Sequence, residues 1–209
     1  MTRAHAAMVA LFFGVLAWSG YRPHDTFTWV LEVTPAVLGL ALSAALWNRF
    51  RFTDFIYWWI TLHCIVLMVG GKYTYAEMPA FNWLRDEFGL ARNYYDRLGH
   101  FMQGFVPALI AREVLLRLGV IARPRWVNPI ILAIVLAFSA FYEFIEWWVA
   151  LATGESATAF LGTQGDPWDT QWDMFMCTIG ACLSLLLLSG VHDRALARRQ
   201  PSRTSAAMR

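Results

Sequence analysis

The sequence is poor in charge of either sign. Only 15% of its 209 residues are charged and 58% are hydrophobic, whereas a typical soluble domain is about 25% charged. Its 17 basic and 15 acidic residues nearly balance, leaving a formal charge of +2. Binding to nucleic acid requires a basic surface that neutralises phosphates. The composition therefore excludes a soluble globular protein and indicates that nucleic acid is not a partner.

The sequence also has few cysteines and none of several common catalytic motifs. Cys64, Cys177 and Cys182 all lie in apolar runs, which predicts small core residues rather than a disulfide framework or a CxxC metal ribbon. A P-loop, an HExxH pair, a dinucleotide fingerprint and a nucleophile elbow are all missing from the sequence. These absences argue against the familiar chemistries of soluble enzymes.

Long apolar runs are what the sequence does contain. A transmembrane helix needs about 20 mostly apolar residues, and the runs do not alternate as the strands of a membrane barrel would. We therefore expect an all-α fold, a polytopic membrane bundle of about six transmembrane helices in one domain over residues 1–191. A basic, disordered, cytoplasmic tail is expected at 192–209. The predicted spans are 5–20, 27–47, 54–71, 98–118, 127–151 and 172–190.

The distribution of basic residues predicts the orientation of the bundle. Short loops rich in Arg and Lys stay in the cytoplasm, and most of the arginines fall on the side of the N-terminus and the tail. Both termini are therefore expected in the cytoplasm. The first run follows Arg3 in the manner of a signal peptide, but no A-x-A-like cleavage pattern comes after it, so we count it as a span.

Ionisable residues gather at three span ends that this topology brings to the outer half of the membrane. Such residues are costly within a span, so they indicate a functional site. Residues four or three apart share one helical face. The fifth loop, GDPWDTQWD, adds carboxylates with no Lys or Arg between them. The residues of this predicted cluster are Asp96, His100, Glu143, Glu146, Asp166, Asp169 and Asp173.

So many carboxylates at a site partly shielded from water require a cation to balance their charge, and a divalent metal ion would supply it. Mixed His and carboxylate ligands are typical of Zn, Fe or Mn, whereas oxygen ligands alone suit Mg. We expect Glu146 and Asp169 to be catalytic, moving protons. Individual aspartates could instead simply cap helices or hold turns. The predicted metal ligands are Asp96, His100, Glu143, Asp166 and Asp173.

Weaker candidates lie beside this cluster, as contacts to a substrate or as a proton relay. His63 is equally well explained as a buried histidine bonded to a neighbour, and Arg112 with Glu113 looks structural because adjacent helical residues do not face each other. A stripe of small residues, Cys177, Gly180, Ala181 and Ser184, predicts close helix packing. The substrate or relay candidates are Glu32, His63, Tyr73, Tyr75 and Gln103.

Several irregular segments resemble one family. GGKYTYAEMP, RNYYDRLGHFMQGFVPALIARE, FYEFIEWW and above all FLGTQGDPWDTQWDM are similar to the YjdF-type family of small bacterial inner-membrane proteins. The resemblance runs from the second span to the sixth. It implies a multi-pass helical protein in the bacterial inner, or cytoplasmic, membrane, and it assigns no catalytic residues.

Three functions fit these observations. The first is a metal-dependent enzyme that hydrolyses, or transfers a headgroup or phosphoryl group on, a lipid or lipid-linked substrate at the outer half of the membrane. The second is a cation- or proton-coupled transporter in which His63, Arg112 and Glu113 continue a polar path inward. The third is a structural membrane protein whose acidic cluster binds an ion. Membrane lipids are the expected partners in each case, and the sequence predicts no oligomeric state.

Overall fold

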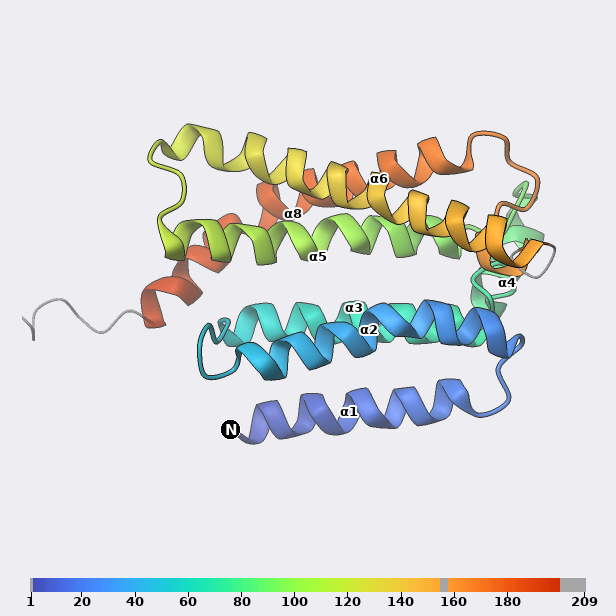
Figure 1. The fold of residues 1–209 in the computed structure, drawn as a ribbon, viewed down its shortest axis with the longest axis horizontal. Helices are drawn as coiled ribbons and strands as arrows, with labels where there is room; N and C mark the ends of the chain where they lie inside the picture. Colours follow the sequence, from blue (N-terminus) through green and yellow to red (C-terminus); the bar gives the residue numbers. More distant parts are fainter. Residues whose placement is uncertain (1, 155–157, 200–209) are drawn as a thin grey trace, which may run out of the picture.

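A computed structural model describes residues 2–154 and 158–199, and over these residues every regular element is helical, as the sequence predicts. The six helices of 18 or more residues within these described ranges lie roughly along one direction (Figure 1). The elements are α1 (Arg3–Gly20), α2 (Thr26–Leu46), α3 (Asp54–Lys72), α4 (Pro79–Phe88), α5 (Tyr95–Leu118), the 3-10 turn η1 (Pro124–Trp126), α6 (Val127–Thr153), α7 (Thr158–Leu161) and α8 (Asp169–Arg199).

Five segments are long and apolar enough to cross a membrane: α1, α2, α3, η1 with α6, and α8. Helix α5 is 24 residues long and lies beside α3 and α8 along most of their length (Figure 1). Its ionisable side chains lower its mean hydropathy, but its position in the middle of the bundle shields them from lipid. About six spanning helices is therefore compatible with the structure.

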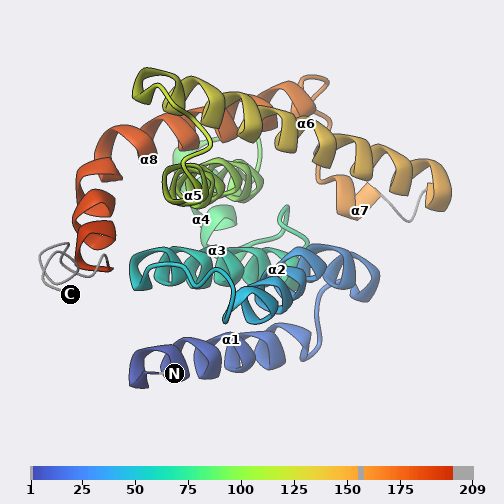
Figure 2. The same cartoon turned by 60° about the vertical axis from the view of Figure 1, so that its left-hand side comes forward.

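The bundle is built in layers, with α5 in its centre. Figure 2 shows α1 on one side, α2 and α3 next to it, then α5, and α6 with α8 on the far side. One core cluster joins α1, α3 and α5 around Ile56 and Leu109, and a second joins α5, α6 and α8 around Ile131 and Cys177. Burying these apolar faces together also buries the polar side chains of α5.

Helices α5 and α8 pack unusually closely, because each presents a glycine to the other. A Cβ atom on Gly104 would overlap the carbonyl of Cys177, and one on Gly180 would overlap the carbonyl of Phe101. This contact agrees with the small-residue stripe expected on the sixth span. The close approach lets side chains at both ends of α5 reach α8.

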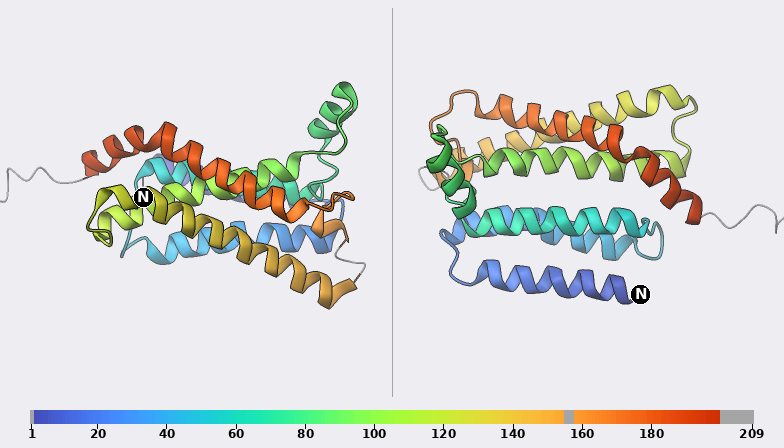
Figure 3. Two further views of the ribbon diagram at one scale, coloured as in Figure 1. Left: turned by 90° about the horizontal axis from the view of Figure 1, so that it is seen from above. Right: turned by 180° about the vertical axis from the view of Figure 1, so that it is seen from behind.

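Two ends of the bundle are distinguished by their connections (Figure 3). The α4 end carries α4, α7 and the segments 73–94 and 162–168. The η1 end carries η1, the start of α1 and the last turns of α8. The positive-inside pattern predicts that the η1 end faces the cytoplasm.

Two local features are not evident from the apolar runs. Helix α4 forms within residues 72–93, because Pro79 suits a first helical turn and Gly89 ends the helix in the left-handed conformation. The tail was expected to be disordered from residue 192, but α8 continues to Arg199, since His192 is fully buried and good helix formers follow it. Residues 200–209 lie outside the described residues.

Candidate functional site

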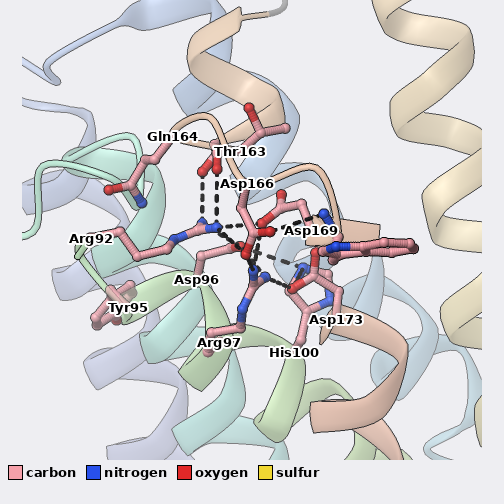
Figure 4. A network of polar contacts seen from close by, with 12 residues as sticks. Arg92, Tyr95, Asp96, Arg97, His100, Thr163, Gln164, Asp166, Asp169 and Asp173 are labelled. Carbon is pink, nitrogen blue, oxygen red and sulfur yellow. Dashed lines mark hydrogen bonds and ion pairs between the residues drawn. The ribbon is translucent and has the colours of Figure 1, made fainter. Parts of the chain in front are cut away.

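Two buried arginines organise the polar residues at the α4 end. Arg92 and Arg97 are each only 6% exposed. A guanidinium nitrogen of Arg92 donates to Asp169 Oδ1 at 2.5 Å and to the carbonyl of Thr163 at 3.0 Å, and another donates to the carbonyl of Gly162 at 2.9 Å. Figure 4 shows both guanidinium groups pointing into the loop before α8. Arg92 therefore ties that loop to the segment that precedes α5.

Arg97 completes the network from the first turn of α5. It donates to Asp169 Oδ1 at 2.6 Å, to Asp166 Oδ2 at 3.2 Å and to Asp173 (Figure 4). Asp169 Oδ1 thus accepts from both arginines at once. Charge-assisted bonds of this kind are about twice as strong as neutral ones, so the start of α8 is fixed against α5.

These arginines correct the charge argument drawn from the sequence. The fifth loop has no Lys or Arg of its own, but Arg92 and Arg97 arrive from a distant segment and pair with Asp166, Asp169 and Asp173. A metal ion is therefore not required to balance those carboxylates. One signal in the sequence could have indicated this pairing. Asp96 and Arg97 are adjacent at the edge of a span, where two charges need partners from a neighbouring element.

Backbone and amide contacts hold the loop in register. The side-chain amide of Gln164 accepts from the Asn93 backbone N–H at 3.0 Å and donates to the Asn93 carbonyl at 2.9 Å. Asp166 Oδ1 accepts from the Trp168 backbone N–H at 2.9 Å, as in a turn. Asp166 therefore stabilises a turn in this loop, in addition to its contact with Arg97.

A second set of ligand atoms lies just inside the arginines. His100 Nε2 is 3.4 Å from Asp96 Oδ1 and 3.6 Å from Asp173 Oδ1, and one atom from each of these buried residues lies within 4.8 Å of the others. His100 Nδ1 is 3.0 Å from Gln103 Oε1, which can only accept. With its Nδ1 proton donated to Gln103, the ring presents Nε2 to two carboxylates, which Arg97 also contacts. A second proton on the ring, or a metal ion bound at Nε2, would make the contact between the ring and the carboxylates favourable.

Two residues of this triad, Asp96 and His100, line the polar end of a cavity of about 240 Å³, whereas Asp173 is not part of its lining. The same end is lined by Glu32, Tyr75, Gln103, Tyr142 and Glu146, and the rest of the wall is mostly apolar. Leu42 on α2 and Phe138 on α6 line the cavity and are also 60% and 51% exposed. Exposed apolar side chains in a membrane bundle face lipid, so the cavity is bordered by the lipid-facing surface.

Some buried polar atoms around this cavity have no partner among the described residues. They are His63 Nε2 and Tyr75 OH, which line the cavity, and Oε1 of Glu143, which is three residues before the cavity residue Glu146 on α6. Burial raises the pKa of the Tyr75 phenol well above its usual range, so that group stays a hydrogen-bond donor. Buried polar atoms are almost always paired in proteins, so these groups indicate a ligand.

The structure brings most of the predicted residues to one place, but not all of them. The residues that line the cavity are Glu32, His63, Tyr75, Asp96, His100, Gln103 and Glu146. Asp173 joins the triad, Asp166 and Asp169 face the arginines, and Glu143 is on α6, outside the lining of the cavity. Tyr73 is separate, because its ring packs near Trp18 and the Lys72 ammonium.

Arg112 and Glu113 lie at the η1 end and bind other residues there. Glu113 accepts from Thr53 N–H and Oγ1 at 2.9 and 2.7 Å and from Arg117 at 2.8 Å, and it lies 3.0 Å from His192 Nε2. Arg112 donates to an exposed carboxylate of α8 at 2.7 Å. Neither residue lines the cavity. The polar path that a transporter would need is therefore not continued by these two residues.

Comparisons with known proteins agree with this membrane architecture. Residues 4–194 match the family described as "Predicted membrane protein (DUF2238)". The chain is 47% identical over 184 residues to the inner membrane protein YjdF of Escherichia coli strain K12, covering 88% of each chain. No solved structure matches the chain significantly. The resemblance to YjdF seen in the sequence is confirmed, and the chain belongs to the DUF2238 family of multi-pass membrane proteins.

Proposed function

We propose that this protein is a metal-dependent membrane enzyme that hydrolyses, or transfers a headgroup or phosphoryl group on, a lipid or lipid-linked substrate. Asp96, His100 and Asp173 would hold a divalent ion. The observation that carries the proposal is their position: three buried ligand atoms lie within 4.8 Å of one another, and two of these residues, Asp96 and His100, line the polar end of a mostly apolar cavity.

The spacing and chemistry of the triad suit a metal ion. Ligand atoms about 2.1 Å from a tetrahedral ion lie about 3.4 Å apart, close to the 3.4 and 3.6 Å between His100 Nε2 and the two carboxylates. Gln103 fixes the ring through Nδ1, which is the usual support for a metal-ligating histidine. One imidazole with two carboxylates favours Zn, Mn or Fe over Mg.

The cavity itself indicates an amphipathic substrate. Its walls are apolar along α2 and α6, whereas Tyr75 OH and His63 Nε2 offer unpaired polar atoms to a headgroup or linker oxygen. A lipid substrate can enter sideways between α2 and α6, where Leu42 and Phe138 line the wall and remain exposed. Its polar end would then lie beside the triad.

The residues beside the triad divide the chemical work. When bound by the triad, a divalent ion would supply the positive charge that polarises the scissile group and activates water. Glu146 lines the cavity but is not one of the three triad residues. We assign proton transfer to it. Asp169 is held by both arginines, so we now assign it a positioning role rather than the proton transfer expected from the sequence.

Lipid turnover in vesicles tests this function. The protein is stripped with chelator, reloaded with Zn²⁺ or Mn²⁺ and reconstituted in vesicles of phosphatidylethanolamine and phosphatidylglycerol, and released headgroups are measured by mass spectrometry. Metal-dependent release should fall at least 100-fold in Glu146→Gln, because a general acid or base contributes about 10²–10⁴-fold. Tyr73→Phe is the control, since Tyr73 lies outside the cavity.

A proton-coupled carrier is the second candidate, and one observation favours it. The cavity is lined by α2 residues from Glu32 to the end of that helix at Leu46, and His63 lines it with an unpaired Nε2. A dye reporting pH inside the same vesicles distinguishes the two. Proton flux that disappears in His63→Leu, with no lipid product, would favour the carrier over the enzyme.

A further inference from the structure

A second cavity, of about 560 Å³, lies at the η1 end between the turn before α3 and the last turns of α8. Figure 2 shows those last turns of α8 running past α5 toward the start of α3. The basic residues that line this cavity come from the turn before α3 and from α8, and they are distant from the triad of Asp96, His100 and Asp173. The four arginines that line it are Arg51, Arg194, Arg198 and Arg199.

The lining carries a clear excess of positive charge. Asp54 is the one acidic residue in it, and its carboxylate is already 3.0 Å from His5 and 3.8 Å from Arg51. No ion pair within residues 2–154 and 158–199 involves Arg194 or Arg198. Two or more guanidinium groups that converge without carboxylates form the usual site for a phosphate.

The frame of this cavity is held in place by specific contacts. Arg199 donates to the carbonyl of Phe52, and Arg117 donates to the carbonyl of Arg51 at 2.7 Å. The Arg51 guanidinium lies over the Trp47 ring, 4.4 Å from its centroid. The turn that carries Arg51 is therefore fixed before any ligand arrives, which reduces the entropy lost on binding.

One side of the cavity is apolar. Phe55, Val191 and Ala195 line it, and the Phe55 ring stacks on His192 at a centroid distance of 5.4 Å. Both elements lie at the end of spanning helices, where phospholipid phosphates and the first carbons of the acyl chains are found. A charged side next to an apolar side matches a phosphate group with its attached glycerol.

We propose that this arginine cavity binds a phosphate group at the membrane surface, carried by an anionic phospholipid or present as free phosphate. The guanidinium groups of Arg194 and Arg198 would contact the phosphate, and Phe55 with Val191 would contact the adjoining carbons. The proposal does not depend on the metal triad at the other end of the bundle.

Lipid binding to the full chain in detergent tests the proposal. Native mass spectrometry is used to titrate phosphatidylglycerol and, separately, phosphatidylethanolamine. A basic residue near an anionic surface contributes about fivefold in affinity, so Arg194→Gln with Arg198→Gln should weaken phosphatidylglycerol binding about 30-fold. Arg123→Gln with Arg125→Gln is the matched control, because it removes the same charge from exposed positions at the same end.

Competition distinguishes the two sources of phosphate. If millimolar inorganic phosphate displaces phosphatidylglycerol from the wild type, the site accepts free phosphate; if it does not, the site is specific for lipid. Either result supports the proposal if Arg194→Gln with Arg198→Gln loses phosphatidylglycerol binding and keeps the wild-type melting temperature. Equal losses in the two double variants, or wild-type binding in Arg194→Gln with Arg198→Gln, would overturn it.

Discussion

The two ends of α5 carry similar charged residues, but the polar atoms around them differ in how completely they are paired. At the η1 end, both carboxylate oxygens of the fully buried Glu113 have partners, including Thr53, Arg117 and His192. At the α4 end, the carboxylates of Asp96 and Asp173 also face arginine and histidine. That network adjoins a cavity and is surrounded by polar atoms that have no partner among the described residues.

This difference separates a structural cluster from a candidate site. A buried charge is tolerated when it is completely paired, and such a cluster mainly fixes how helices pack. An incompletely paired cluster beside an open volume is costly to maintain unless a ligand completes it. The residue types at the two ends are alike, so the unpaired polar atoms beside the 240 Å³ cavity, rather than composition, support our proposal that the α4 end binds a ligand.

The largest expected effect is on stability, from breaking the η1-end cluster. Glu113→Ala leaves His192 and Arg117 without their buried partner, and removing one member of a buried pair costs about 3–5 kcal/mol. The melting temperature in detergent should fall well below that of the wild type. Glu87→Ala is the control, because that carboxylate is exposed and lies outside both clusters. Similar melting temperatures for both variants would contradict a structural role for Glu113.

The close contact between α5 and α8 connects both ends and gives the next largest effect. Gly180→Ala places a methyl group against the Phe101 carbonyl, so the helices must separate, at a cost of about 1–3 kcal/mol. Gly14→Ala is the control, since its Cβ would meet nothing within 4 Å. Thermal unfolding should distinguish the two, and a Gly180→Ala protein as stable as Gly14→Ala would mean that the helices are not held this closely.

Arg92→Gln should loosen only the polar network at the α4 end. It removes charged hydrogen bonds to Asp169 and to the carbonyls of Gly162 and Thr163, each worth about 1.5–3 kcal/mol. Hydrogen exchange in residues 162–169 should become at least tenfold faster, while exchange in α5 near Glu113 is unchanged. Uniform acceleration over the whole chain would show that the two clusters are not independent.

The smallest effect is expected away from both clusters, at Asp25. Its side chain caps α2 by accepting from the Thr28 N–H at 2.7 Å, and that bond lowers the pKa of Asp25 below its usual value. A lowered pKa contributes stability above the unfolded-state pKa of about 3.9 that is lost as pH falls through the folded-state pKa.

Asp25→Ala should therefore cost about 0.5–2 kcal/mol near neutral pH and progressively less below about pH 4. Asp25→Asn keeps a capping oxygen and should cost less than the alanine variant. Melting temperatures of the three proteins at several pH values provide the check. A loss from Asp25→Ala that does not change with pH would contradict the capping account.

The architecture could be predicted from the sequence because hydrophobic length decides it. The apolar runs located the long helices, and the stripe around Gly180 anticipated the contact between α5 and α8. The short helix α4 escaped notice, because its boundaries depend on Pro79 and Gly89 rather than on an apolar run. Local signals of that kind are weaker than the constraint imposed by the bilayer.

The candidate site could be predicted only in part. Spacing along helices located Asp96, His100 and Asp173 near one another, because the topology fixed which helix ends meet. The pairing of Arg92 and Arg97 with the loop before α8 was missed, since it joins segments about 70 residues apart in the chain. No periodicity records such a contact, so the charge balance of a buried cluster requires the tertiary structure.

The metal content of the purified protein tests the central claim most directly. Elemental analysis after purification in detergent without chelator would compare the wild type with His100→Gln and with the matched variant His192→Gln at the η1 end. We predict near-stoichiometric divalent metal in the wild type and in His192→Gln, and a loss in His100→Gln. Wild-type protein that contains no metal and takes up none when dialysed against Zn²⁺ or Mn²⁺, or equal loss in both variants, would contradict the assignment of the α4 end as a metal site.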